Sequence, residues 1–202
     1  MKQTLRLPLL FFGFCAAIAA SSTFAAAQNN FDVSAGLSTL DAPGAHVATG
    51  INNQPQTLTG GAYLNFNGDF LFYKNAGVEA EFVRKESQGV YIVDNLPFRP
   101  LYFDLNAIWT KSVHKHFTFE IEGGGGEESI RFYTCGSSCY AAKNHAMIDG
   151  GAGLRIYPMN RTFARHFFIR PEGRFYLVFN NAQFSSDKVI RYGASIGYTF
   201  KR

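Results

Sequence analysis

The last stretch of the chain, residues 188–200, restricts what the protein can fold into more than any other segment. Alternate positions there are apolar or aromatic, and the positions between them are mostly small or polar. The apolar set is Ile190, Tyr192, Ala194, Ile196, Tyr198 and Phe200. Because successive side chains of a β-strand point to opposite faces, the pattern predicts a strand with one apolar and one polar face. A soluble sheet with its apolar face inside and a membrane barrel with that face turned to lipid both satisfy it.

The N-terminal residues 1–27 have the three-part pattern of a cleaved secretory signal. Lys2 and Arg6 give a positive start, an apolar run follows, and small residues lead to Ala27. The apolar run is too short to anchor the chain as a spanning helix. We therefore expect cleavage after Ala27, which N-terminal sequencing would check, and we assign residues 28–202 to one domain.

The exported chain, about 175 residues long, has the size of a single domain. No later segment approaches the roughly 20 continuous apolar residues that a spanning helix needs, so any membrane insertion must use strands. The formal net charge of +4 includes Lys2 and Arg6 of the signal, so the charge gives no support for nucleic-acid binding. The chain shows no internal repeat, low-complexity tract or second domain.

Eight segments show the two-residue period of β-strands. They cover residues 31–40, 57–73, 77–85, 100–111, 117–126, 145–157, 167–179 and 188–200. The connections after the first, third, fifth and seventh segments are long, those after the second and fourth are short, and that after the sixth is intermediate. We therefore predict an all-β fold, an eight-stranded antiparallel up-and-down transmembrane β-barrel. Its long loops would face outside, and its last strand would close the barrel against the first.

Two places depart from an ideal strand. Pro171 lies in the middle of the seventh segment, where it removes one ladder donor and suggests a bulge. After Glu127 and Glu128, the apolar residues Ile130 and Phe132 fall on the face that carries the carboxylates earlier in the segment. A bulge, or emergence of the strand from the membrane, would account for this change.

The polar faces of the strands carry charges of both signs near the strand middles. An eight-stranded membrane barrel fills its narrow interior with side chains, so these residues are expected to form an ion-pair network in the lumen. In a soluble sheet the same residues would form the solvated face, so this pattern alone does not decide between the two. The expected network is Glu79, Glu81, Asp104, Glu120, Glu122, Asp149, Arg155, Arg170, Glu172, Arg174 and Arg191.

The opposite faces favour the membrane. They are apolar on nearly every segment, and aromatic residues fall near the strand ends, for example Phe70, Phe72, Trp109, Tyr198 and Phe200. Aromatic belts at both interfaces are expected of a lipid-facing barrel. Together with the export signal, these faces predict a location in the bacterial outer membrane.

The arrangement resembles the small eight-stranded bacterial outer-membrane proteins of the OmpA and OmpX type. The resemblance is architectural, covers residues 31–200 and includes no diagnostic motif. Its most specific part is the closing segment Y-G-A-S-I-G-Y-T-F. Members of that group often end in an alternating strand with a final aromatic residue, which the barrel-assembly machinery recognises. The resemblance therefore implies an assembly signal, although Lys201 and Arg202 follow here; its residues would be Tyr192, Ile196, Tyr198 and Phe200.

Cys135 and Cys139 form the motif C-G-S-S-C in a polar stretch. Export to an oxidising compartment favours a short-loop disulfide between them. A metal site is the weaker interpretation, because no second cysteine pair or nearby histidine completes four ligands.

The sequence gives no sign of catalysis. It contains no G-x-S-x-G elbow and no His-x-Ser pair of the kind found in lipid A deacylases. The glycine run 123–126 is not followed by Lys-Ser or Lys-Thr, which excludes a phosphate-binding loop. His114 and His116 lie at a short turn, where solvated side chains are the simpler interpretation. We expect no catalytic, cofactor or metal site.

The first hypothesis is therefore a non-enzymatic, monomeric barrel whose loops contact surfaces, protein partners or lipopolysaccharide. The loops concerned cover residues 41–56, 86–99, 131–143 and 180–187. A porin-like narrow pore for ions or small solutes, an outer-membrane lipid-modifying enzyme, and a soluble periplasmic lipocalin-like binding barrel remain open as alternatives. Partners would be outer-membrane lipid and, during insertion, the barrel-assembly machinery, but not nucleic acid.

Overall fold

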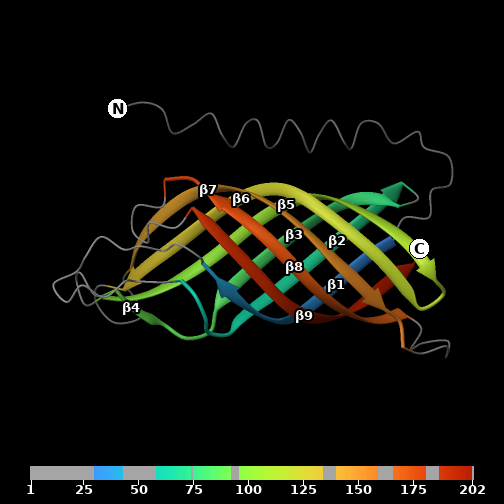
Figure 1. The fold of residues 1–202 in the computed structure, drawn as a ribbon, viewed down its shortest axis with the longest axis horizontal. Coiled ribbons are helices and arrows are strands. Elements are labelled where there is room, and N and C mark those ends of the chain that lie inside the picture. The colour runs from blue at the N-terminus through green and yellow to red at the C-terminus, as the bar shows by residue number, and fades with distance from the viewer. Residues whose placement is uncertain are drawn as a thin grey trace.

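The computed structural model is a closed antiparallel β-barrel (Figure 1). It describes residues 30–42, 58–73, 75–91, 96–133, 140–158, 166–180 and 187–201. The strands are β1 (Asn30–Asp41), β2 (Tyr63–Tyr73), β3 (Ala76–Lys85), β4 (Gly89–Tyr91), β5 (Leu96–His114), β6 (Phe117–Tyr133), β7 (Tyr140–Ile156), β8 (Phe167–Val178) and β9 (Lys188–Lys201).

Every barrel strand pairs with its neighbours in the sequence, which confirms the predicted up-and-down order. The sheet runs β3-β2-β1-β9-β8-β7-β6-β5-β4, and an additional pairing of β3 with β5 completes the ring. The short β4 pairs only with β5 and lies at the left-hand end of the barrel in Figure 1. The closing strand pairs with β1 from Asn30–Lys201 to Asp41–Ile190. The start of β1 and the end of β9 therefore lie at the same end of the barrel, as the sequence predicts.

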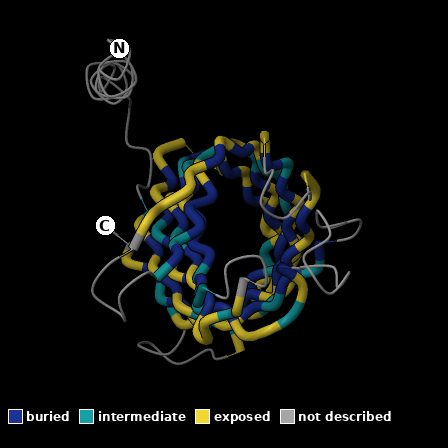
Figure 2. Tube along the Cα trace, turned by 90° about the vertical axis from the view of Figure 1, so that its left-hand side faces the viewer, coloured by how far each residue is buried: buried dark blue, intermediate teal, exposed yellow. Residues whose placement is uncertain are grey.

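The barrel is inverted relative to a soluble protein. Its outward side chains are apolar and exposed, for example Ile196 at 65% and Leu37 at 57%, whereas the inward Arg170 and Glu79 are both 0% exposed. Figure 2 looks along the barrel and shows buried and exposed residues alternating around the ring. An apolar exterior around a charged interior suits lipid outside the barrel. The soluble lipocalin-like alternative requires the reverse arrangement and is wrong.

Several predicted features lie outside the described residues. They include the signal 1–27 with its cleavage site, both cysteines of the predicted disulfide, and most of the loops 41–56 and 180–187. Among the residues that are described, no helix has the length and apolar character needed to cross a membrane.

The second strand is shorter than the sequence pattern predicts. It begins at Tyr63 rather than at residue 57, because Gly60 and Gly61 adopt positive φ angles of 81° and 84° and turn the chain. The amide of Gly60 donates to the carbonyl of Leu40 at 2.7 Å, which ties this turn to the end of β1. The two-residue period of segment 57–73 predicts Leu58 on the same outer face as Phe66 and Phe70, but Leu58 is 0% exposed and lies inside the barrel.

Of the two explanations for the change at Ile130 and Phe132 of β6, the bulge is wrong, and emergence of the strand from the membrane stays a prediction. Pairing with β5 runs without a shift from Phe98–Phe132 to Ser112–Thr118. Ile130 is therefore on the same inward face as the carboxylates, and the face itself changes from charged to apolar toward its end. What changes is the composition of the lumen rather than the register of the strand.

Pro171 interrupts one ladder without shifting it. It pairs with Ala194 on β9, but the ladder with β7 is missing between Gly153–Glu172 and Ile156–Ile169. The same register resumes on both sides of the gap. The predicted loss of a ladder donor is confirmed, and the predicted bulge is wrong.

Candidate functional site

The lumen holds a column of buried ion pairs. Four guanidinium groups on β7, β8 and β9 reach carboxylates on the facing walls. Nearest the short-turn end, Arg155 lies 2.6 Å from a carboxylate oxygen of Asp69 on β2 and 2.6 Å from one of Glu120 on β6. It also pairs with Asp32 on β1. One side chain thus links three other strands of the wall.

Arg170 continues the column one step further. Its Nη1 lies 2.7 Å from Glu79 Oε2 on β3, and its Nη2 lies 2.6 Å from Glu172 Oε2 on β8 itself. Its Nε lies 3.3 Å from Glu120 Oε1, so Arg155 and Arg170 share the carboxylate of Glu120.

Arg174 has the most partners. Its Nε lies 2.8 Å from Glu122 Oε1 and its Nη1 lies 3.0 Å from Glu81 Oε2. Weaker or additional partners complete its surroundings: Asp104 at 3.5 Å, Asp149 at 3.7 Å, and Glu79. Arg191 ends the column, with Nη2 lying 2.7 Å from Glu81 Oε1 and 2.9 Å from Glu172 Oε1.

The structure thus brings together all eleven residues that the sequence pattern singled out for the lumen, and it adds Asp32 and Asp69. The signal for these two was present, since both alternate with outward-facing apolar neighbours. Asp32 pairs directly with Asp69 in the register, and Asp69 with Glu79. Like charges opposite one another on neighbouring strands repel, and the arginines offset this repulsion. Nine carboxyl groups share the four guanidiniums, so the lumen is rich in acid.

Two glycines on the inner face of β7 make room for this network. A Cβ at Gly151 would lie 2.6 Å from Glu122 Oε1, and one at Gly153 would lie 2.5 Å from Glu120 Oε1. Both distances are shorter than real Cβ contacts, so any larger residue would displace a carboxylate from its arginine.

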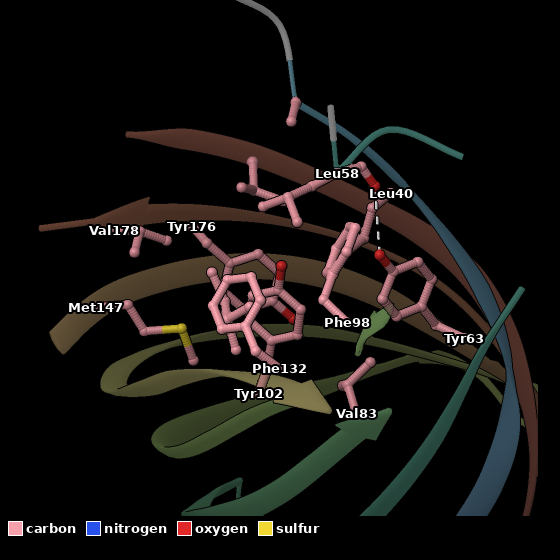
Figure 3. Packing of buried hydrophobic residues seen from close by; sticks show 13 residues of the cluster. Leu40, Leu58, Tyr63, Val83, Phe98, Tyr102, Phe132, Met147, Tyr176 and Val178 are labelled. Atoms are coloured by element: carbon pink, nitrogen blue, oxygen red, sulfur yellow. Dashed lines mark hydrogen bonds between the residues drawn. The ribbon is translucent and has the colours of Figure 1, made fainter. Parts of the chain in front are cut away.

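An apolar cluster closes the lumen at the long-loop end. Figure 3 shows these side chains pointing toward one another inside the barrel wall. Every barrel strand contributes, and Leu58 enters from the turn before β2. The members are Leu40, Ala42, Leu58, Tyr63, Val83, Phe98, Tyr102, Ile130, Phe132, Met147, Tyr176, Val178 and Val189. We call this group the apolar cap.

Tyrosines join the apolar cap to the ion pairs beneath it. The rings of Tyr102 and Tyr176 stack with centroids 5.6 Å apart. The hydroxyl of Tyr176 donates to Glu81 Oε2 at 3.3 Å, and that of Tyr102 donates to Glu128 Oε1 at 2.8 Å. Buried phenols thus find polar partners while their rings pack with the cap. The sequence pattern did not single out the cap, although the inward parity of Ile130 was its visible signal.

The residues of the expected assembly signal lie on the outer face of β9. Tyr192 is 54% exposed and Phe200 is 49% exposed. Tyr198 packs edge-on against Phe200, with ring centroids 4.7 Å apart, and against Phe167 of β8 at 5.0 Å. The seam of the barrel thus carries an aromatic group at the short-turn end.

The histidines near the short turns have structural partners. The Nδ1 of His116 lies 2.8 Å from the carbonyl oxygen of Tyr157 on the neighbouring hairpin. The rings of His114 and His116 are 5.7 Å apart. Within the described part of the chain, no group of three or more His, Cys, Asp or Glu residues is arranged to hold a metal ion.

The fold matches solved small barrels. No protein-family model matches the chain, and no curated protein matches it in sequence. The N-terminal β-barrel domain of Pseudomonas aeruginosa OprF is 13% identical, covers 86% of this chain and 98% of that one, and has a TM-score of 0.57. The outer membrane protein OprG of P. aeruginosa is 12% identical, with 87% and 98% covered and a TM-score of 0.57.

A third match is Ail, the attachment invasion locus protein of Yersinia pestis, in complex with the heparin analogue sucrose octasulfate. It is 16% identical, with 86% of this chain and 99% of that chain covered, and the TM-score is 0.53. At these identities the likeness concerns the fold. By its fold, this chain is an eight-stranded bacterial outer-membrane β-barrel.

Proposed function

We propose that the protein is a non-enzymatic outer-membrane scaffold with a closed lumen, whose external loops contact surfaces or partners. The observation that carries this proposal is the apolar cap over the ion-pair column. Phe132 is 7% exposed and Leu58 is 0% exposed, so the lumen ends in packed side chains directly beneath the long loops. An eight-stranded lumen is just wide enough for side chains to fill, and here they do so along its length.

The long strands support an external role. β6 and β7 each have 17 residues and β5 has 19, compared with about 9–11 residues for a strand that crosses a bilayer. At about 3.4 Å per residue, these strands extend well past the membrane at the long-loop end. They form a hydrogen-bonded sheet that continues above the lipid, where β4 pairs with the start of β5. A raised, hydrogen-bonded sheet is a suitable platform for contact with another surface.

A matched structure gives further support. Ail, which has the same fold, has been crystallised with the polyanion sucrose octasulfate. A barrel of this fold can therefore bind a ligand from outside the cell envelope's own lipids, as the proposal requires of this chain.

A narrow cation pathway is the second candidate. The excess of carboxyl groups over guanidiniums favours cations inside the lumen if the apolar cap is removed. Conduction would then require the arginine column to rearrange as well, because Arg174 alone contacts five carboxylates.

Recordings in planar bilayers test the proposal. The purified full chain is expected to give no defined current steps. The variant Leu58→Ala/Phe132→Ala removes two members of the apolar cap. Its recordings are compared with those of Leu37→Ala, a matched change on the lipid face, and current steps in the cap variant alone would identify the cap as the barrier. Current steps from the unmodified protein would contradict the closed lumen. A changed lipid A mass in cells that produce the protein would contradict the non-enzymatic role.

A further inference from the structure

A basic depression lies on the outer wall of the barrel, away from the lumen. It has a volume of about 490 Å³ and lies over β3, β5 and β6. Its apolar part consists of Phe82, Leu101 and Phe103, its basic part of Arg84, Arg99 and Arg131, and Tyr133 completes the lining. All seven belong to the outward-facing positions of their strands, so the depression faces the surroundings of the barrel.

The strand register concentrates positive charge there. Arg99 is directly opposite Arg131, and Arg84 is directly opposite Leu101, two residues along β5 from Arg99. Like charges directly opposite one another destabilise a sheet. Neither Arg84 nor Arg99 forms an ion pair with any described residue, although Arg99 Nη2 donates to the carbonyl oxygen of Glu86 at 3.1 Å. An anion in the depression would meet three guanidinium groups.

The apolar part lies next to the arginines on the side toward the membrane. The rings of Phe82 and Phe103 are 4.9 Å apart, and Phe103 is 44% exposed within the lipid-facing surface. Leu101 is only 4% exposed although it is on the outer face, so neighbouring side chains cover it. Glu127, the outward residue opposite Phe103, lies nearer the middle of the membrane than the arginines do. Its negative charge disfavours an anion at that depth. The arginines therefore stand at the upper edge of the lipid-facing band.

We propose that this depression binds a phosphorylated lipid of the outer leaflet. Arg84, Arg99 and Arg131 would hold the phosphate groups of the headgroup, and an acyl chain would lie against Phe82 and Phe103. Arginine suits this task because its planar fork donates two parallel hydrogen bonds to a phosphate. The inference rests on the orientation in the proposed function, in which the long-loop end faces outward.

The test uses the purified full chain in a non-ionic detergent. Binding is measured for bisphosphorylated lipid A, for the same lipid without phosphates, and for inorganic phosphate alone. The double variant Arg99→Gln/Arg131→Gln is expected to weaken binding of the phosphorylated lipid by about tenfold or more. Lys111→Gln, which changes an exposed cation at the opposite end of β5, is expected to leave binding within about twofold.

Three outcomes would overturn the proposal. The double variant could bind the phosphorylated lipid as the parent does, the parent could bind the lipid equally well without phosphates, or inorganic phosphate alone could occupy the site as tightly as the lipid. If the double variant folds poorly, Arg99→Lys/Arg131→Lys is used instead. It keeps both positive charges but loses the paired guanidinium donors, so its affinity for the phosphorylated lipid is expected to lie between those of the parent and of the Gln variant. None of these readouts depends on lumen conductance, so this proposal and that of the closed lumen fail separately.

A second readout separates a binding role from a structural one. In lipid-free detergent, Arg99→Gln alone is expected to change the thermal midpoint little, because it removes both a hydrogen bond to the carbonyl oxygen of Glu86 and a like-charge contact with Arg131. A lowered midpoint would show that Arg99 serves the fold and would count against the site.

Discussion

Arg191 on the last strand donates across the lumen to Glu81 on β3, 110 residues earlier in the chain. The Nη2 atom lies 2.7 Å from one carboxylate oxygen and 2.9 Å from the other. Both residues are nearly inaccessible, with 1% and 4% exposed. The last strand is therefore held in two ways: it pairs with β1 at the closure of the barrel, and Arg191 binds Glu81 of β3 across the lumen.

Removing this guanidinium is expected to destabilise the barrel. Arg191→Met leaves Glu81 with one guanidinium, that of Arg174 at 3.0 Å, besides its hydrogen bonds from Asn67 and Tyr176. The loss is expected to be about 2–4 kcal/mol in the free energy of unfolding. Urea titration of the refolded protein measures it, with Lys111→Met as the exposed control. Adding Glu81→Gln is expected to cost less than the sum of the two single changes. Additive losses would show that the two groups do not interact.

Two adjacent glycines provide a matched test of the packing in the lumen. Gly151→Ala places a Cβ 2.6 Å from Glu122 Oε1, whereas the nearest atom to a Cβ at Gly150 is a backbone oxygen at 3.7 Å. Gly151→Ala is therefore expected to destabilise the barrel by about 1–3 kcal/mol, and Gly150→Ala by much less. The unfolding midpoint in urea distinguishes them. Equal effects would mean that the inner face of β7 has room that the carboxylates do not use.

The closing aromatic residue is expected to matter for assembly more than for stability. Phe200 is 49% exposed, and Phe66 on β2 is 47% exposed, so both face outward to a similar degree. If β9 carries the assembly signal, Phe200→Ala reduces the folded, heat-modifiable form in cell membranes several-fold more than Phe66→Ala does. Both variants are expected to refold equally well in detergent. Equal losses in cells would refute a special role for the terminal aromatic.

The predicted disulfide between Cys135 and Cys139 has a direct chemical check. In protein purified from the cell envelope, neither thiol is expected to react with a maleimide until a reductant is added. Labelling without reduction would leave both as free cysteines and remove the expected brace from the loop after β6.

The faces of the strands were readable from the sequence because strands alternate with a strict period of two. Ile196 and Arg191 fall on opposite sides for this reason alone, and every inward charge follows from the same parity. Partners within the lumen were not readable. The meeting of Arg191 with Glu81 depends on the stagger of all strands around the barrel, and no local pattern encodes this stagger.

The apolar cap was missed for a different physical reason. The expectation that apolar side chains face lipid is valid only within the membrane, and Ile130 and Phe132 lie beyond the ion pairs, where they pack with the other members of the apolar cap. Leu58 was misplaced because Gly60 and Gly61 turn the chain by adopting φ angles that the alternation pattern does not reveal.

The central claim, that the apolar face of the barrel meets lipid, is tested most directly by the chain's single tryptophan. Trp109 is on the outer face of β5 near the short-turn end and is 39% exposed. In vesicles containing brominated lipids its fluorescence is expected to be strongly quenched, more by bromines near the headgroup than by those at the chain ends, while aqueous acrylamide has little effect. Efficient quenching by acrylamide with no effect of brominated lipid would contradict the inverted barrel.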